Sequence, residues 1–240
     1  MSNKIRRHTI EKYYKQKNNS AARHFFAPGK KRGKRFSKSR KAEILRNKKL
    51  CKRYPWLIPR NNFTGEVCWG GRPYDNTLLD DMLKGWRIAF GDIWCEEMDK
   101  AIRLDSCADV FRIIQLKEKY GQLRCYTNVY SPNIKHVVNA FEVISEYICV
   151  YCGSIDAHIV NDRGWFWPLC RDCYKKDVVD KLGDDADPYE ETNKDIMPDS
   201  YTLHTYNSKT KEDQYKTYDI SDITTKIKLK YGKRLRRRNE

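Results

Sequence analysis

Residues 149–173 read CVYCGSIDAHIVNDRGWFWPLCRDC and contain two Cys-x-x-Cys pairs. Seventeen residues separate the pairs, a spacing that is typical of zinc sites. Two thiolates that are two residues apart can reach one ion from a tight turn, and Gly153 suits such a turn. The second pair completes a tetrahedron of four sulfurs, which leaves no position for water. The spacing therefore predicts one structural Zn²⁺ bound by four cysteines, with redox or disulfide chemistry as the alternative: Cys149, Cys152, Cys170 and Cys173.

Two features between the pairs allow more than one interpretation. His158 is a competing ligand, but with four thiolates available we expect it to be a loop residue. The aromatic run Gly164-Trp165-Phe166-Trp167-Pro168 could stack on bases or cover the metal against the core, and we favour the cover. Residues 149–182 thus form a zinc ribbon and a following helix.

The preceding residues, 54–148, predict an α+β core. From Thr77, a plausible N-cap, apolar residues recur at three- and four-residue steps, which indicates a helix with a possible break near Gly85. Two β runs around Gly121-Gln122 predict a type II′ hairpin. Ser131-Pro132 is a typical start for a second helix, which leads directly into Cys149. We therefore expect a helix–β-hairpin–helix core with the ribbon attached to it.

The predicted hairpin register pairs Lys119 with Arg124 and Lys117 with Tyr126. Glu118 interrupts the apolar row, and we expect a rim charge paired to a nearby lysine or arginine rather than a catalytic group. The inner face then carries Ile114, Leu116, Tyr120, Leu123, Cys125 and Val129. The outer face carries Lys117, Lys119, Arg124, Tyr126 and Tyr130. Basic and aromatic side chains in one row suit phosphate contact and base stacking, although a solvated face has the same composition.

The net charge of +16 is unevenly distributed. Residues 1–53 carry a net charge of +18 and residues 226–240 carry +7, whereas residues 54–225 carry −9. An arm of this density repels itself unless a polyanion neutralises it, so we expect nucleic acid as the partner, with an anionic protein surface as the alternative. The predicted contacts are Lys30, Lys31, Arg32, Lys34 and Arg35 in the first arm, Lys117, Lys119, Arg124 and Tyr126 in the hairpin, and Arg234, Arg236, Arg237 and Arg238 in the tail.

The remaining segments are predicted to be an arm, a linker, a second hairpin and a tail. Residues 1–53 predict an extended arm in which AEILRNKKLCKRY adds a short helix, and Trp56, Leu57 and Ile58 anchor it on the core. Residues 183–200 form an acidic linker, residues 201–225 a possible second hairpin, and residues 226–240 a partly extended basic tail. No stretch approaches the ~18 apolar residues of a membrane span. The N-terminus has no apolar segment of a secretory signal, so nine cysteines indicate a reducing compartment.

Three stretches, in this order, carry a resemblance: GWRIAFG, KEKYGQLRCY and CVYCG…PLCRDC. They resemble small zinc-ribbon proteins of bacteriophage genomes and prophages, which generally have no assigned function. The resemblance covers roughly residues 54–175. It implies a viral origin and a location in the host cytoplasm or the virion, and it offers no catalytic residues.

Motifs of the common enzyme classes are missing from the sequence. There is no Gly-rich phosphate loop, no His-Glu-x-x-His and no Gly-x-Ser-x-Gly, and none of the five histidines supplies the His-x-Glu of zinc deaminases. We therefore expect a non-catalytic nucleic-acid-binding protein that is virion-packaged, ribosome-associated or regulatory. The alternatives are a protein-interaction factor that inhibits or redirects a host machine, and a nuclease with an unrecognised site.

Overall fold

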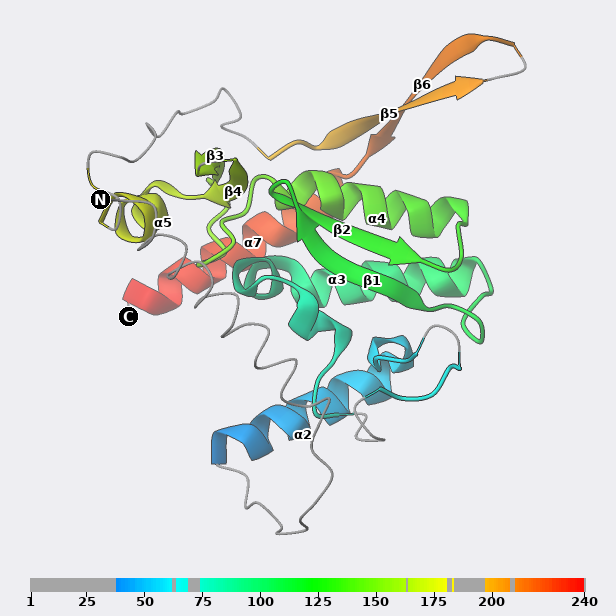
Figure 1. Ribbon diagram of the computed structural model, residues 1–240, viewed down its shortest axis with the longest axis horizontal. Coiled ribbons are helices and arrows are strands. Elements are labelled where there is room, and N and C mark those ends of the chain that lie inside the picture. The colour runs from blue at the N-terminus through cyan, green and yellow to red at the C-terminus, as the bar shows by residue number, and fades with distance from the viewer. Residues whose placement is uncertain are drawn as a thin grey trace, which may run out of the picture.

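The computed structural model describes residues 38–61, 64–68, 74–162, 164–180, 183, 197–207 and 210–239 (Figure 1). Its helices and turns are α2 (Lys38–Arg53), η1 (Pro55–Leu57), η2 (Leu78–Asp81), α3 (Lys84–Leu104), α4 (Pro132–Ser145), α5 (Arg171–Tyr174), the π-helical turn η3 (Lys175–Val179) and α7 (Ser221–Asn239). Its strands are β1 (Ile113–Lys119), β2 (Gln122–Thr127), β3 (His158–Asp162), β4 (Trp165–Leu169), β5 (Ser200–Asn207) and β6 (Glu212–Asp219). Consecutive strands pair as three two-stranded antiparallel sheets. The prediction of a mixed fold with a four-cysteine cluster is confirmed at this level.

The core lies between α3, α4 and the β1–β2 hairpin (Figure 1). Trp86, Phe90 and Trp94 of α3 are fully buried, and the Phe90 ring lies 5.2 Å from the Phe141 ring of α4. The indole Nε1 of Trp86 also donates hydrogen bonds to the carbonyls of Ser145 and Ile148, both at 3.0 Å. Trp86 therefore fixes the chain at the point where α4 ends and the first cysteine pair begins.

The predicted break in the first core helix occurs before Gly85. Thr77 caps the short turn η2, because the Asp80 carboxylate accepts a hydrogen bond from the Thr77 backbone N–H at 2.7 Å. The chain then becomes extended at Met82, and α3 begins at Lys84. Gly85 lies inside α3, where an added Cβ would come within 1.9 Å of the Cys149 carbonyl oxygen. A glycine is needed here because the cysteine loop packs on the helix backbone, rather than to break the helix.

The register predicted for the first hairpin is wrong. The turn lies at Tyr120-Gly121 instead of Gly121-Gln122, and its two central residues have φ values of +53° and +79°. Positive φ at both central positions defines a type I′ turn, which shifts the pairing. As a result Lys117, and not Lys119, lies opposite Arg124.

The shifted register corrects part of the predicted inner face. Leu116, Leu123 and Cys125 are buried as predicted. Ile114 and Tyr120 are exposed instead, because the pairing is irregular between Ile113 and Gln115 and because Tyr120 belongs to the turn.

The short helix predicted within the N-terminal arm is longer in the structure. It is α2, which has sixteen residues, so this part of the arm is not extended. One face of α2 packs on the core: Cys51 is buried, and the buried Asn47 side chain donates a hydrogen bond to the Tyr74 carbonyl at 3.2 Å. The chain then turns through η1, where Leu57 is fully buried. The predicted anchoring on the core is therefore confirmed for Leu57, and Trp56 and Ile58 pack against the core as well.

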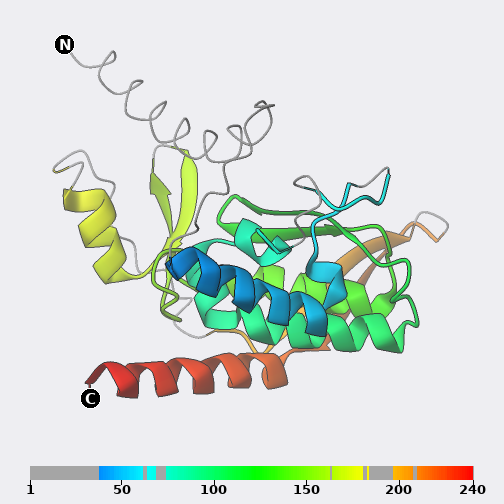
Figure 2. The same cartoon turned by 90° about the horizontal axis from the view of Figure 1, so that it is seen from below.

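The C-terminal residues form a helix rather than a partly extended tail. The helix α7 runs along α3 (Figure 2), and its residues Ile223 and Ile227 are buried. The Lys226 ammonium forms an ion pair with Glu97 of α3 at 2.6 Å, and Lys230 pairs with Asp92 of the same helix. The apolar and acidic surface of α3 thus accounts for the helical tail.

The predicted second hairpin is confirmed as β5 and β6, which project from the body of the molecule (Figure 1). Most of the acidic linker predicted at 183–200 lies outside the described residues. Within the part of the chain that the structure describes, no helix has the length and apolar character to cross a membrane.

Candidate metal centre

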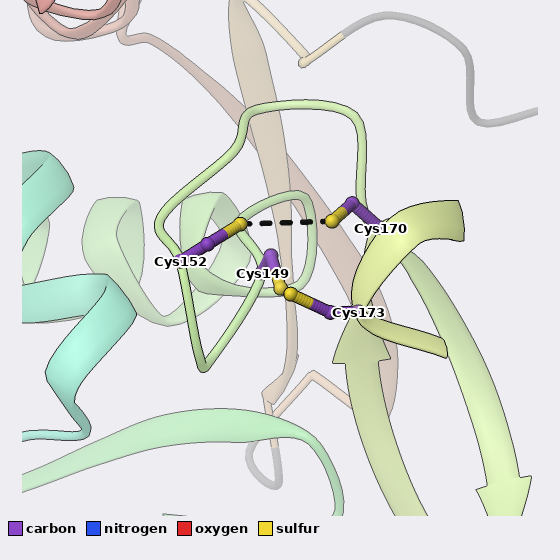
Figure 3. Close-up of side chains that lie close together, drawn as sticks. All are labelled: Cys149, Cys152, Cys170 and Cys173. Carbon is purple, nitrogen blue, oxygen red and sulfur yellow. Dashed lines mark hydrogen bonds between the residues drawn. The ribbon is translucent and has the colours of Figure 1, made fainter. Parts of the chain in front are cut away.

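Four cysteines that are far apart in the sequence meet at one point (Figure 3). Cys149 and Cys152 lie on the turn after α4, Cys170 directly precedes α5, and Cys173 lies within it. Their Sγ atoms all lie within 4.8 Å of one another, and those of Cys152 and Cys170 are 3.6 Å apart. The predicted ligand set is therefore assembled, with two buried and two half-buried side chains.

The first pair is held in a tight turn that packs on α3. The Gly153 N–H donates a hydrogen bond to the Cys149 carbonyl at 2.9 Å, and Gly153 has a φ of +73°. An added Cβ on Gly153 would lie 2.6 Å from the Gly85 carbonyl oxygen. On the other side of this contact, the Gly85 N–H donates to the Val150 carbonyl at 2.7 Å. Two glycines thus let the cysteine turn and the first turn of α3 touch through their backbones.

The β3–β4 hairpin brings the second pair to the first. Val150 N–H donates a hydrogen bond to the Pro168 carbonyl at 3.0 Å, which joins the first cysteine turn to β4. Cys170 follows at the end of that strand and is the N-cap residue of α5. His158 lies in β3, opposite Leu169, and is not part of the cysteine cluster. The prediction that His158 is not a ligand agrees with this placement, although it lies on a strand rather than a loop.

The four sulfurs fit a tetrahedrally bound metal ion. Metal–sulfur bonds of about 2.3 Å put neighbouring sulfurs ~3.8 Å apart in a tetrahedron, close to the Cys152–Cys170 separation of 3.6 Å. Without an ion between the sulfurs, burial and the neighbouring cysteines raise the pKa of Cys173, so this thiol ionises only when a cation is bound. Four thiolates at this density therefore require a cation to neutralise them.

A basic side chain from α7 closes over the cysteine turn. Arg234 Nη2 donates hydrogen bonds to the carbonyls of Cys152 at 2.9 Å and Gly153 at 3.2 Å. The Arg234 guanidinium carbon lies 5.3 Å from the centroid of the Tyr231 ring, and the Tyr231 hydroxyl lies 2.8 Å from Ser154 Oγ. Arg234 therefore holds the cysteine turn, and its predicted contact with nucleic acid stays a prediction.

The sequence of α7 contains a signal for this contact in its apolar residues, apart from its charge. Ile223, Ile227 and Tyr231 recur at four-residue steps, which indicates a helix with one buried face. Arg234 follows three residues after Tyr231 and therefore lies on the same face. Its carbonyl acceptors, however, are more than eighty residues away and come together only in the fold.

The aromatic run between the cysteine pairs divides into two parts. Pro168 and Leu169 are buried next to the cysteine turn, as the predicted cover requires. Trp165 and Phe166 are exposed at the other end of β4, and the Trp165 ring stacks on Trp167 with centroids 6.5 Å apart. Only the end of the run nearest Cys170 covers the metal centre.

The predicted contacts on the hairpin lie on one face, but they are not equally available. The Lys117 ammonium lies 5.3 Å from the centroid of the Tyr126 ring, and Lys119 lies at the same distance from the Tyr120 ring. Arg124 forms an ion pair with Glu142 of α4 at 2.8 Å and is therefore partly neutralised. Hence the hairpin offers two lysines and one tyrosine rather than the full predicted row.

Glu118 serves the turn of the same hairpin. Its carboxylate accepts a hydrogen bond from the Gly121 N–H at 2.7 Å. A lysine or arginine partner, as predicted for a rim charge, is therefore not its main contact. The carboxylate instead stabilises a turn with two positive φ values.

The remaining predicted contacts lie at the ends of the chain. Arg236 and Arg237 are exposed in the last turns of α7. Arg238 belongs to the same helix, but its side chain lies outside the described residues. The five arm residues also lie outside the described part of the chain: Lys30, Lys31, Arg32, Lys34 and Arg35.

The structure adds a basic surface that the predicted contacts do not include. The helix α2 carries eight basic residues and one acid, Glu43, which pairs with Arg40 at 2.8 Å. Seven of the eight basic side chains are exposed: Lys38, Lys41, Arg46, Lys48, Lys49, Lys52 and Arg53. We call these seven residues the α2 basic face. The charge of residues 38–53 could be counted from the sequence. The side of α2 on which these charges lie is known only from the structure.

The chemistry of the metal centre follows from its closed ligand set. Four cysteines around one ion leave no open position for a substrate or a nucleophilic water, so the centre is suited to holding the fold together. It joins the end of α4, the β3–β4 hairpin and α5, and through Arg234 it also contacts α7. Comparison of the chain with protein-family models, with curated proteins and with solved structures gave no match.

Proposed function

We propose that the protein is a non-catalytic nucleic-acid-binding protein in which the α2 basic face neutralises phosphates and a structural Zn²⁺ orders the cysteine module. The observation that carries this proposal is the exposure of seven basic side chains on sixteen residues of α2. Flexible charged tails occur in many proteins, whereas this face is fixed on the core by Asn47 and Cys51. A rigid row of cations along a helix about 24 Å long suits the regular spacing of backbone phosphates.

The nearby basic residues extend this proposed surface. Lys30, Lys31, Arg32, Lys34 and Arg35 precede α2 in the sequence, and we assign them to the same electrostatic contact. Lys117, Lys119 and Tyr126 on the hairpin, and Arg236, Arg237 and Arg238 at the end of α7, are secondary contacts in this proposal. Arg124 and Arg234 are omitted because each is half-buried and has a partner inside the protein. Arg53 is kept because it stays exposed although it pairs with Glu96 at 3.4 Å.

Zinc is the ion that best suits the metal centre in this proposal. Four cysteine thiolates in a closed tetrahedron are a common zinc set, and in such modules the metal supplies folding free energy. Because the sequence resembles bacteriophage zinc-ribbon proteins, we further propose a location in a host cytoplasm or a virion, where a reducing environment would keep the thiolates free to bind metal.

The experiment is a titration of the purified protein with random-sequence DNA and RNA, followed by fluorescence anisotropy between about 50 and 200 mM salt. We expect binding to both, with log K falling linearly against log salt because phosphate contacts release counterions. The nucleic acid that co-purifies with the protein identifies the preferred type. Affinity that does not depend on salt, or an absence of binding at low salt, would contradict the proposal.

A second candidate is a protein-interaction factor, and the β5–β6 hairpin favours it. Along the described side chains of β6 the residues are almost all exposed, and Tyr215 is 70% exposed. An isolated two-stranded hairpin is only marginally stable in water, so a projecting hairpin is a plausible site for a partner. Deletion of residues 202–217 separates the two candidates. Nucleic-acid affinity should be unchanged if α2 carries the function, whereas association with a protein partner should be lost if the hairpin carries it.

A further inference from the structure

A cavity of about 680 Å³ lies between the C-terminal end of α2, the turn η1, the end of α3 and the segment before β1. This volume is in the usual range of small-molecule sites, about 300–1,000 Å³. Its lining includes five basic side chains, Lys52, Arg53, Arg60, Arg103 and Arg112. Two acids, Asp99 and Asp109, leave the lining with a net positive charge. The cavity therefore favours an anionic ligand.

Aromatic rings form part of the same cavity. Trp56 is half-buried, and its ring packs edge-on against Phe111, with centroids 6.0 Å apart, and against Trp94, at 5.4 Å. Its indole Nε1 lies 3.4 Å from the Asp99 carboxylate. These contacts fix the orientation of the Trp56 ring before any ligand binds. A flat ligand can stack on such a ring at little cost in side-chain entropy.

Two of the guanidinium groups are held together at the rim. Arg60 Nη1 donates a hydrogen bond to the Gly65 carbonyl at 3.0 Å, and Arg112 packs over the same glycine, 3.1 Å from the position of an added Cβ. By contrast, Arg103 pairs with Asp99 at 2.9 Å. Within the described residues, no carboxylate forms an ion pair with Arg60 or Arg112. Their charges are therefore available to an anion.

The cavity is continuous with the α2 basic face, because Lys52 and Arg53 belong to both. We propose that it receives one unpaired nucleotide of a single-stranded nucleic acid, with the base on Trp56 and the phosphate at Arg60 and Arg112. This inference rests on the proposed function and adds a preference for single strands. A duplex keeps its bases stacked inside the helix, so it can contact the α2 basic face but cannot place a base in the cavity.

The experiment compares a single-stranded oligonucleotide with a duplex of the same sequence and length, using fluorescence anisotropy at one salt concentration. The cavity variant is Arg60→Gln with Arg112→Gln. The matched control is Lys38→Gln with Lys41→Gln, which removes two charges at the far end of α2, roughly 15–20 Å from Lys52. We expect the wild type to bind the single strand about ten-fold more tightly, since one stacked base contributes on that scale. The cavity variant should lose this preference, whereas the control should weaken both probes by the same factor.

Adenosine 5′-monophosphate and inorganic phosphate test the cavity with small ligands. We expect the nucleotide to bind the wild type and to displace the single strand, and phosphate at the same concentration to do neither. Binding of the nucleotide by the wild type and not by the folded cavity variant assigns the site to Arg60 and Arg112.

The outcomes separate the two proposals. Equal losses in the cavity variant and the control, for both probes, overturn the cavity inference and leave the proposed function intact. If neither strand binds the wild type, the proposed function is wrong, and adenosine 5′-monophosphate alone decides whether the cavity takes a nucleotide. No binding of the nucleotide overturns the inference in either case. Thermal melts of both variants establish that each is folded.

Discussion

The helices α2 and α7 carry the same net charge of +7 but use it in different ways. On α2 seven basic side chains are exposed, and the helix is anchored through uncharged or polar contacts such as Cys51 and Asn47. On α7, Lys226, Lys230 and Arg234 recur at four-residue steps and contact Glu97, Asp92 and the cysteine turn. Net charge in a sequence therefore does not locate a nucleic-acid surface. Exposure distinguishes the two helices better, since on α2 even Arg53, which pairs with Glu96 at 3.4 Å, is 66% exposed.

The largest effect should come from the metal centre, on which the α7 contacts partly depend. Cys149→Ser or Cys173→Ser should release about one equivalent of zinc and unfold the ribbon, because structural zinc contributes about 10–16 kcal/mol in small modules. Without the cysteine turn, Arg234 loses its carbonyl acceptors, so hydrogen exchange should rise in the second half of α7 and stay slow in α2. Zinc analysis and exchange by mass spectrometry measure the two effects. Cys68→Ser, a half-buried cysteine outside the cluster, is the control. A metal-free protein with wild-type protection throughout would show that the centre is not structural.

The next largest effect should come from the α2 basic face. Lys41→Gln with Lys48→Gln and Lys52→Gln removes three exposed charges and should leave the fold unchanged. If three phosphate contacts are lost, the slope of log K against log salt becomes shallower by about 2–3. Anisotropy titrations across a salt series measure it. An unchanged slope would move the contact to the residues before α2 or to the hairpin.

The metal ligands could be predicted from sequence because their signal is local. Two residues between cysteines and a following glycine describe a turn, whatever packs around it. The hairpin register was different, since it depended on Tyr120 adopting a φ of +53°, which few residues other than glycine adopt. Glu118 stabilises that turn through Gly121, and a contact of this kind is not visible in a pattern of apolar residues.

The two basic helices show where charge analysis fails. The stretch AEILRNKKLCKRY predicts a short helix. The length and the exposed face of α2, however, depend on how Asn47 and Cys51 pack. In α7 the buried face can be predicted from Ile223 and Ile227, whereas the partners of Lys226 and Lys230 lie on α3, more than a hundred residues earlier. Tertiary contacts therefore decided which basic residues remain exposed.

A smaller effect is expected from the ion pairs of α7, and it should appear in stability rather than in binding. Lys226→Gln with Lys230→Gln should lower the free energy of unfolding by about 1 kcal/mol, a modest value because water screens these partly exposed pairs. Burial alone would raise the pKa of Glu97, but hydrogen bonds from Lys226 and Lys100 hold it below its ordinary value. A lowered pKa means that the stabilisation is present above the unfolded pKa of about 4.3 and is lost as the pH falls through the folded value. Denaturant titrations at neutral and acidic pH should therefore show a difference between wild type and variant that shrinks in acid.

Nucleic-acid titrations of the same α7 variant provide the contrast with α2. The salt slope should match that of the wild type, because Lys226 and Lys230 are already paired with carboxylates. A slope reduced by as much as that of the α2 variant would mean that the α7 pairs open on binding, and the distinction between the two helices would fail.

The smallest effects should come from the β1–β2 hairpin. Two residues that face each other there differ in the same way as α2 and α7, because one is paired with a carboxylate and, among the residues that the structure describes, the other is not. Lys117 and Arg124 lie opposite one another, but Lys117 contacts the Tyr126 ring while Arg124 pairs with Glu142. Lys117→Ala removes a like-charge neighbour and also a cation–π contact, so stability should change by only a few tenths of a kcal/mol.

Arg124→Ala should instead destabilise the fold by about 1 kcal/mol, because it leaves the half-buried Glu142 carboxylate without its partner. Burial already raises the pKa of Glu142, against the opposing effect of Arg124, and removal of the arginine should raise it further. A carboxyl with a raised folded pKa contributes stability below its unfolded pKa that is lost as the pH rises through the folded value. The Arg124→Ala variant should therefore recover stability relative to wild type as the pH is lowered toward 4, whereas Lys117→Ala should show no such trend. Urea titrations of both variants from neutral to acidic pH measure the difference. Parallel pH profiles would mean that Glu142 does not depend on Arg124, and Arg124 would then return to the set of available phosphate contacts.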